Sequence, residues 1–250
     1  MIVKWIDVLP IKGQEQAFSI AQEAWATTNE CTGFSGQLGG WTTAQRSAAA
    51  SINESARESG NPHSRAMLLA FWHDMPAIED FMVSKHDLIA HNNQQAQTYE
   101  ACLVHYLSLE LSLNDLALQQ SLQQAIIDFN AININDIGFI RIADCTLKTD
   151  EHEWAEHAFF QDQIHVWNPA MQACEGMLGG AVARFQKEKN RFLVISFWQN
   201  ELCHHKYCQG AFKAAKRQVN LAAYMDKLTG HYIVIEPKWH IEKMERERSV

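Results

Sequence analysis

Apolar residues recur along the chain at the spacings of strands and amphipathic helices. Residues 2–9 are apolar and β-branched and end at Pro10, a pattern that predicts a strand. Phe18, Ala21 and Trp25 then recur at helical spacing and predict a helix. Beyond it, the pattern predicts extended segments at 33–41, 67–72 and 102–111 and a helix over 75–97. This order, β-α-β-β-α-β, is that of a ferredoxin-like unit.

The same order of elements returns in the second half of the chain. Phe71-Trp72 corresponds to Phe197-Trp198 at an offset of 126 residues (197 − 71), and His105-Tyr106 corresponds to His231-Tyr232 at the same offset. The glycines at 33 and 36 correspond to those at 176 and 179 at a different offset, because the first half has additional residues before its Phe-Trp strand. Self-similarity of this length indicates duplicated domains rather than a solenoid of short repeats.

We therefore predict an α+β chain of two tandem ferredoxin-like copies. The predicted parts are a first copy over 1–111, a linker helix within 112–136, a second copy over 137–239 and a charged tail over 240–250. In the second copy we expect strands at 137–146, 175–185, 192–198 and 231–239 and helices at 151–167 and 202–227. The Ala-, Ser- and Asn-rich stretch from Thr42 to Ser64 has no counterpart in the second copy, so it is expected to be a mobile loop or a lid.

Composition and charge exclude several classes of function. With 47% hydrophobic and 20% charged residues, the chain can bury a sizeable core, and no apolar stretch is long enough to predict a membrane span. The first residues lack the plan of a signal peptide, so a cytoplasmic protein is expected. A net charge of -8 argues against a nucleic-acid binder. The six cysteines follow no zinc or redox spacing, which predicts reduced thiols.

Several segments of the first copy together resemble a known family. They are the opening residues 2–6, the glycine-rich segment 33–41, Phe71-Trp72, and the polar residues between His86 and Tyr99. This set resembles the YdbC-like monooxygenases, which are similar to the antibiotic-biosynthesis-monooxygenase type of dimeric α+β barrel. The resemblance covers about residues 1–111. It implies that this tandem chain forms a single-chain dimeric α+β barrel, as a monomeric pseudo-dimer or a homodimer.

The candidate chemistry lies in the predicted helix over 75–97. At helical spacing His86 and Asn93 share one face, and Asp87 and His91 share an adjacent face. Asp87 is thus placed either to orient His91 or to cap a broken helix, and a histidine held by a carboxylate is a suitable general base.

The second copy lacks this polar set. His86, Asp87 and His91 correspond to Phe212, Lys213 and Arg217, whereas the aromatic packing residues keep aromatic partners. This asymmetry predicts one ligand site per chain, in the first copy. The expected walls and substrate-binding residues are Trp41, Trp72, Phe81, Asn92, Asn93 and Tyr99.

Two further motifs suggest cofactors. Trp72, Phe81 and His91 have the spacing of the signature of haem-degrading monooxygenases, in which the last residue binds iron. Phe81 stands where that signature has tryptophan, and the first strand lacks its asparagine, so we predict no cofactor, with haem as a minor alternative. Cys203, His204 and Cys208 look like metal ligands, but their counterparts in the first copy are apolar, which favours a packing face.

The sequence therefore predicts a monooxygenase-like enzyme that is cofactor-independent and acts on a small apolar or aromatic molecule. The alternative is a non-catalytic protein of the same fold that binds a small molecule or another subunit.

Overall fold

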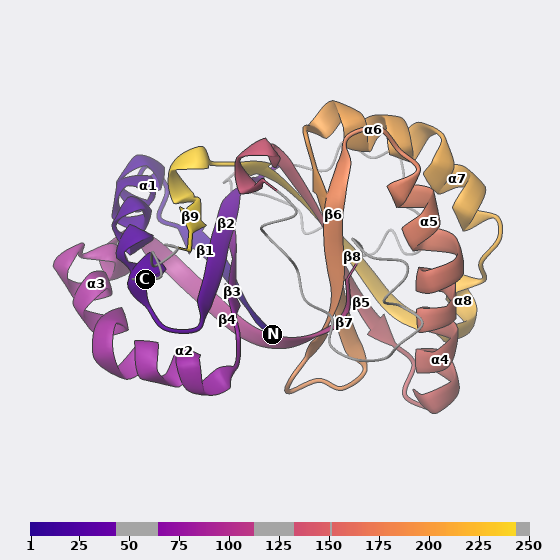
Figure 1. Cartoon of the computed structure of the whole chain (residues 1–250), viewed down its shortest axis with the longest axis horizontal. Helices are drawn as coiled ribbons and strands as arrows, with labels where there is room; N and C mark the ends of the chain where they lie inside the picture. The colour runs from indigo at the N-terminus through magenta and orange to yellow at the C-terminus, as the bar shows by residue number, and fades with distance from the viewer. Residues whose placement is uncertain (44–64, 113–132, 151, 244–250) are drawn as a thin grey trace, which may run out of the picture. The chain divides into compact units, whose positions relative to one another are not determined.

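The computed structural model describes residues 1–43, 65–112, 133–150 and 152–243 (Figure 1). Nearly all of the expected loop, most of the expected linker helix and the end of the tail lie outside the described residues. The chain forms two compact units, with residues 1–42, 63–107 and 235–250 in unit 1 and residues 43–62 and 108–234 in unit 2. No helix in the described parts is long and apolar enough to cross a membrane.

Unit 1 has the predicted order of strands and helices, with shorter helices than the sequence indicated. Its elements are β1 (Ile2–Pro10), α1 (Glu15–Glu23), the 3-10 helix Ala24–Glu30, β2 (Phe34–Thr42), β3 (Ala66–Trp72), α2 (Met75–Phe81), the π-helix Met82–His86, α3 (Asp87–Asn92), the 3-10 helix Gln95–Gln97 and β4 (Tyr99–Ser112). The strands lie in the order β4-β1-β3-β2, and the helices cover one face of this sheet (Figure 1). This is the strand order of a ferredoxin-like unit.

Unit 2 repeats this architecture. Its elements are a 3-10 helix (Ile134–Asp136), β5 (Phe139–Leu147), α4 (His152–Asp162), the π-helix Gln163–Trp167, α5 (Asn168–Gln172), β6 (Met177–Phe185), β7 (Arg191–Trp198), α6 (Glu201–Gln209), α7 (Ala211–Lys216), α8 (Leu221–Tyr224) and β8 (Met225–Ile235). The strand order is β8-β5-β7-β6, so fourth, first, third and second strands again lie side by side. The single helix predicted over 202–227 is divided into α6, α7 and α8. The last of these ends at Tyr224, and β8 begins at Met225.

The duplication extends to backbone detail. In both units the second strand carries a bulge that faces the Phe-Trp strand, between Phe34 and Gly36 in β2 and between Met177 and Gly179 in β6. The loop before each of these strands holds a glycine at positive φ, 76° at Gly33 and 81° at Gly176. A side chain there is strained, and its Cβ would lie within 2.5 Å of a neighbouring side chain. The predicted glycine correspondence is therefore built into the two backbones.

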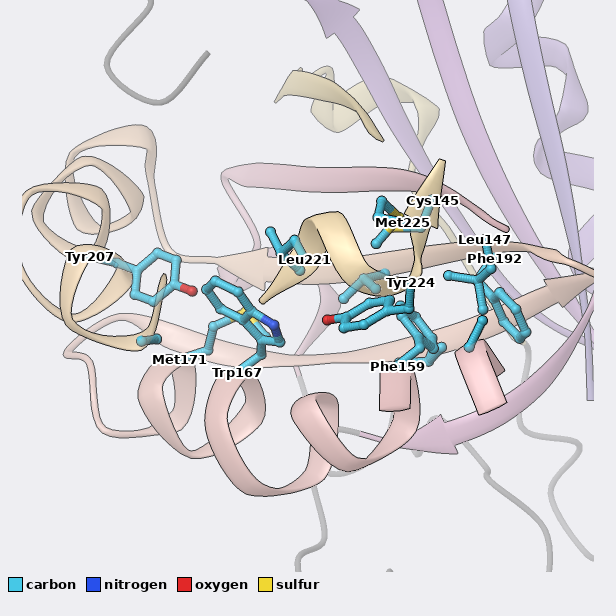
Figure 2. Close-up of a cluster of buried hydrophobic side chains, with 14 of the residues drawn as sticks. Cys145, Leu147, Phe159, Trp167, Met171, Phe192, Tyr207, Leu221, Tyr224 and Met225 are labelled. Carbon is cyan, nitrogen blue, oxygen red and sulfur yellow. The ribbon is translucent and has the colours of Figure 1, made fainter. Parts of the chain in front are cut away.

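The core of unit 2 lies between its sheet and its helices, as Figure 2 shows. Phe159 of α4 is fully buried, and its ring contacts Phe192 at 4.9 Å and Tyr224 at 6.5 Å between centroids. The Tyr224 hydroxyl donates to Asp162 at 2.7 Å, which satisfies the polar end of a buried ring.

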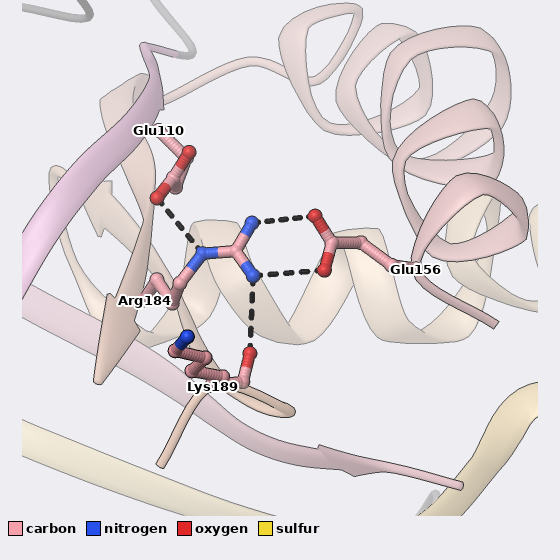
Figure 3. Close-up of polar contacts among 4 residues, drawn as sticks. All are labelled: Glu110, Glu156, Arg184 and Lys189. Atoms are coloured by element: carbon pink, nitrogen blue, oxygen red, sulfur yellow. Dashed lines mark hydrogen bonds and ion pairs between the residues drawn. The ribbon is translucent and has the colours of Figure 1, made fainter. Parts of the chain in front are cut away.

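Arg184 of β6 joins α4 to Glu110, near the end of β4, where residues 108–112 belong to unit 2 (Figure 3). Its guanidinium donates two hydrogen bonds to Glu156 of α4, at 2.6 and 2.8 Å, and one to Glu110 at 2.9 Å. A bidentate pair of this kind has the planar geometry that arginine and carboxylate share. Because it ties α4 to β6 and β4, we read this network as structural.

Residues 235–243 belong to unit 1, whereas the sequence assigned them to the second copy and to a solvated tail. The 3-10 helix Pro237–Trp239 buries Trp239 completely, and its indole Nε1 donates to Ser19 of α1. The short strand β9 (Ile241–Glu242) pairs with Gly36 and Gln37 of β2. The predicted bounds of the second copy and tail therefore differ from those of the structure, because the apolar residues at 239 and 241 pack on unit 1.

Candidate functional site

A cavity of about 100 Å³ lies in unit 1 between the helices and the sheet. Its walls are mostly aromatic and aliphatic. They comprise Lys4, Ile6, Val8, Phe18, Gln22, Trp25, Thr28, Gln37, Leu68, Ala70, Trp72, Phe81, His86, Ala90, Gln95, Tyr99, Cys102 and Val104. For scale, an engineered apolar cavity of about 150 Å³ holds benzene, so this space suits a ligand of about one aromatic ring.

Strand alternation explains which side chains reach the cavity. Lys4 and Ile6 of β1 pair with Ala70 and Leu68 of β3, and these four residues lie on the helix-facing side of the sheet. Gln37 of β2 pairs with Ala70 on its other side. Lys4 and Gln37 therefore flank Ala70, whose small side chain leaves the middle of this row open.

Lys4 is the most unusual residue of the cavity. Its side chain is only 5% exposed, and no carboxylate among the described residues pairs with it. Its ammonium group lies 3.7 Å from the Met82 sulfur and 5.7 Å from the centre of the Phe81 ring. Desolvation lowers the pKa of Lys4 to about 8, partly offset by Cys102. A buried cation without a counter-ion is costly, and such residues concentrate at functional sites.

A chain of amides closes one side of the cavity. The Trp25 indole Nε1 donates to Gln95 Oε1 at 2.8 Å, and Gln95 Nε2 donates to Gln22 Oε1 at 3.0 Å. Gln95 is held in place by the left-handed conformation of Gln94, at a φ of 51°, which turns the chain after α3. The buried amides thus partner one another and fix the orientation of Trp25.

His86 lies at the rim of the cavity, at the end of the π-helix. Its ring contacts Trp25 and Phe81 at 5.2 and 5.8 Å between centroids, and its side chain is 25% exposed. Asp87 Oδ1 lies 2.8 Å from His86 Nδ1, although the Asp87 side chain is 93% exposed. When Nδ1 carries the proton, Nε2 is left as the basic nitrogen. The structure therefore pairs Asp87 with His86, where the sequence had suggested His91.

Four of the predicted site residues line the cavity: His86, Trp72, Phe81 and Tyr99. The other five do not. Asp87 reaches the site only through His86, while His91 and Asn92 are exposed and Asn93 donates to the backbone of Ile89. Trp41 packs against Phe18 and Trp239, at 6.0 and 5.1 Å between ring centroids, and does not itself line the cavity.

Sequence reasoning missed Lys4, Thr28, Cys102 and the glutamines of the cavity wall. The signal for Lys4 was available, since it is a charged residue at an inward position of an otherwise apolar strand. Gln22 and Gln95 carry no such signal, because polar residues on a helix are ordinarily solvated.

The residues do not suit haem. His91, which has the spacing of an iron ligand, is exposed and outside the cavity, and a porphyrin is far larger than the space enclosed. We therefore expect haemin added to the purified protein to give no Soret change that depends on His91. Absorbance titration of the wild type and His91→Ala tests this, and a sharpened Soret band lost only in the variant would contradict it.

The Cys203-His204-Cys208 motif forms part of the packing in unit 2. His204 is buried among the rings of Phe139, Trp198 and Tyr232, and Cys208 Sγ lies 3.6 Å from His204 Nε2. Desolvation lowers the pKa of His204 to about 3, which keeps it neutral. No group of three or more metal-ligating side chains occurs in the described residues.

Comparison with known sequences gives one family match, over part of the chain. A family model described as Domain of unknown function (DUF4937) matches residues 2–59 and 56–107. No curated protein sequence matches the chain.

Three solved structures cover almost the whole chain at low identity. A "putative monooxygenase" from Lactobacillus acidophilus aligns over 97% of this chain and 96% of its own, at 10% identity and a TM-score of 0.62. A "putative monooxygenase" from Fusobacterium nucleatum aligns over 94% and 91%, at 10% identity and a TM-score of 0.64. An "anthrone oxidase-like protein" aligns over 100% and 96%, at 9% identity and a TM-score of 0.58.

This chain has the dimeric α+β barrel fold. The fold class expected from the sequence, with tandem ferredoxin-like copies, is thereby confirmed, as is the resemblance to monooxygenases of this fold. Shared fold at this identity does not define an activity, which has to be argued from the cavity.

Proposed function

We propose that the chain is a cofactor-independent oxygenase that acts on a single-ring phenol bound in the unit 1 cavity. The observation that carries the proposal is a small aromatic-walled cavity with a histidine at its rim and a buried lysine that has no counter-ion among the residues the structure describes. The names of the structural neighbours support oxygen chemistry on this fold. The proposed substrate pocket belongs to the first copy.

The proposed reaction begins with removal of the substrate's hydroxyl proton. His86 Nε2 accepts it, while Asp87 holds the opposite ring nitrogen, and the resulting phenolate is electron-rich enough to reduce O2. A new carbon–oxygen bond forms at the ring carbon opposite the hydroxyl, and the product is a quinone. The second oxygen atom leaves as water. Substrate carbon supplies all four electrons, so no external reductant is needed.

The walls have a defined part in this scheme. Trp25, Trp72 and Phe81 surround the ring and exclude water, which strengthens the attraction between the phenolate and the Lys4 ammonium. Lys4 stabilises the anion, and the amide chain through Gln95 keeps the aromatic wall in place. The second copy has no part in the proposed chemistry.

The test is protein-dependent oxygen uptake by the full chain with a panel of single-ring phenols. We expect uptake at least roughly tenfold above the protein-free rate, one O2 consumed per substrate and one ¹⁸O atom in the product from ¹⁸O2. His86→Gln should lower the rate by about a hundredfold or more, because a positioned base contributes roughly 10²–10⁴. His73→Gln, at an exposed histidine outside the cavity, is the matched control and should leave the rate unchanged.

Oxygen uptake equal to the protein-free rate with every phenol would contradict the oxygenase proposal. Saturable phenol binding under those conditions would then favour the alternative, a protein that binds a small molecule without transforming it.

A further inference from the structure

The two copies place equivalent residues around the tryptophan that ends the third strand. In unit 1, β1 and β3 pair Ile2 with Trp72 and Lys4 with Ala70. In unit 2, β5 and β7 pair Phe139 with Trp198 and Arg141 with Ser196. The register thus equates Lys4 with Arg141 and Ala70 with Ser196. Each unit has a cation diagonal to a buried tryptophan, at the separation where long side chains still meet.

The copies differ in what the tryptophan indole contacts. Trp198 Nε1 donates to Ser196 Oγ at 3.0 Å, so unit 2 satisfies its buried N–H internally. Alanine stands at the equivalent position in unit 1, and Trp72 Nε1 has no hydrogen-bond partner among the described residues, although Trp72 is only 1% exposed. Leaving a buried donor unpaired is costly, so the missing hydroxyl calls for an explanation.

The two cations also differ in their contacts: Arg141 of unit 2 has partners within its own unit that Lys4 of unit 1 lacks. Arg141 lies over the Tyr232 ring at 5.0 Å and donates to the backbone carbonyl of Ile142. By contrast, the Lys4 ammonium group has no carboxylate partner among the described residues and lies near the Met82 sulfur, the Phe81 ring and Cys102.

A third group on the cavity wall is also uncommitted. Thr28 is 3% exposed, and its Oγ1 has no partner among the described residues. By contrast, Trp25, Gln22 and Gln95 hydrogen-bond to one another. The uncommitted groups are an ammonium, an indole N–H and a hydroxyl. All three donate hydrogen bonds, and the ammonium adds a positive charge.

We infer that Lys4, Trp72 and Thr28 form a binding site for an anionic oxygen carried by a single aromatic ring. The donors hold the oxygen, and the rings of Trp25 and Phe81 enclose the ligand's ring. Phe81 contacts both ends of the site, since its ring lies 5.0 Å from that of Trp72 and 5.7 Å from the Lys4 nitrogen. The inference rests on the proposed function for its choice of cavity, and it specifies the chemical class of the ligand.

The probe is 4-nitrophenol, which absorbs visible light strongly only as the phenolate and ionises near neutral pH. Titration of the full chain at pH 7 should show saturable binding and an increased phenolate fraction. Its uncharged analogue 4-nitrotoluene should bind at least roughly tenfold more weakly. Lys4→Met should weaken nitrophenolate binding by roughly 10- to 150-fold, the range for one charge-assisted hydrogen bond.

A serine swap separates the indole contact from simple loss of packing. Ala70→Ser supplies the hydroxyl that unit 2 has at Ser196, so it should occupy Trp72 Nε1 and weaken nitrophenolate binding about 2- to 10-fold. Trp72→Phe should give a similar loss, and Ser196→Ala, the matched change in unit 2, should give none. Near-ultraviolet circular dichroism confirms that each variant is folded.

Competition assigns the type of anionic oxygen. Displacement of nitrophenolate by benzoate alone indicates a carboxylate ligand, and displacement by phenol alone indicates a phenolate ligand. Displacement by neither, equal affinity for 4-nitrotoluene, or wild-type affinity in folded Lys4→Met would overturn the inference. Binding without oxygen uptake would leave it intact and remove only the oxygenase proposal, so the two failures are distinguishable.

Discussion

Replacing Lys4 with methionine is expected to stabilise unit 1 while weakening its ligand site. Burial lowers the pKa of Lys4 from the ordinary lysine value of 10.5 to about 8. Each pKa unit corresponds to 1.36 kcal/mol, so keeping the ammonium buried costs about 3 kcal/mol at pH 7. Methionine has a similar shape and no charge, and its side chain suits the neighbouring Met82 and Phe81.

The direction of the pH dependence follows from which state binds more protons. Between pH 8 and 10.5 the folded state has released the Lys4 proton and the unfolded state has not, so the Lys4 contribution to stability rises with pH. The stability advantage of Lys4→Met should therefore narrow by about 3 kcal/mol across this window. Urea unfolding of both proteins at pH 7, 9 and 10.5 measures it, with hydrogen exchange of β1 assigning the transition to unit 1. A difference that stays constant with pH would show that the ammonium is not desolvated.

Truncating Phe159 to alanine is expected to destabilise unit 2 by about 3–5 kcal/mol. This ring is fully buried between α4 and the sheet, where it contacts the rings of Phe192 and Tyr224. Removing it opens a cavity that the surrounding side chains fill only in part. The adjacent Phe160→Ala is the matched control and should cost less, because Phe160 is only partly buried.

The measurement is the urea midpoint of each variant, followed by hydrogen exchange of α4 and β7. Equal losses for Phe159→Ala and Phe160→Ala would mean that the packing of this helix differs from that described.

Local patterns in the sequence sufficed for the order of the elements and for the duplication. Strand alternation and helical spacing depend only on neighbouring residues. Gly33, which the duplication pointed out, adopts a positive φ in the turn before β2. Trp72 and Phe81 were also predictable as cavity walls, because large aromatic residues on an inward face have few other places to pack.

Which residues line the site depends on the phase of the helices and on the pairing of the strands, and spacing along the sequence determines neither. Residues 82–86 form a π-helix, whose wider turn shifts the phase of the helix that follows. In the structure Asp87 pairs with its neighbour His86, and His91 is exposed. Trp41 packs against Trp239, which is distant in sequence, and therefore does not line the cavity. The difference between Ala70 in unit 1 and Ser196 in unit 2 could be interpreted only once the strand register was known. The register places each of these residues beside a cation and a tryptophan. Periodicity therefore determined the elements, and tertiary packing decided which of their polar groups share one cavity.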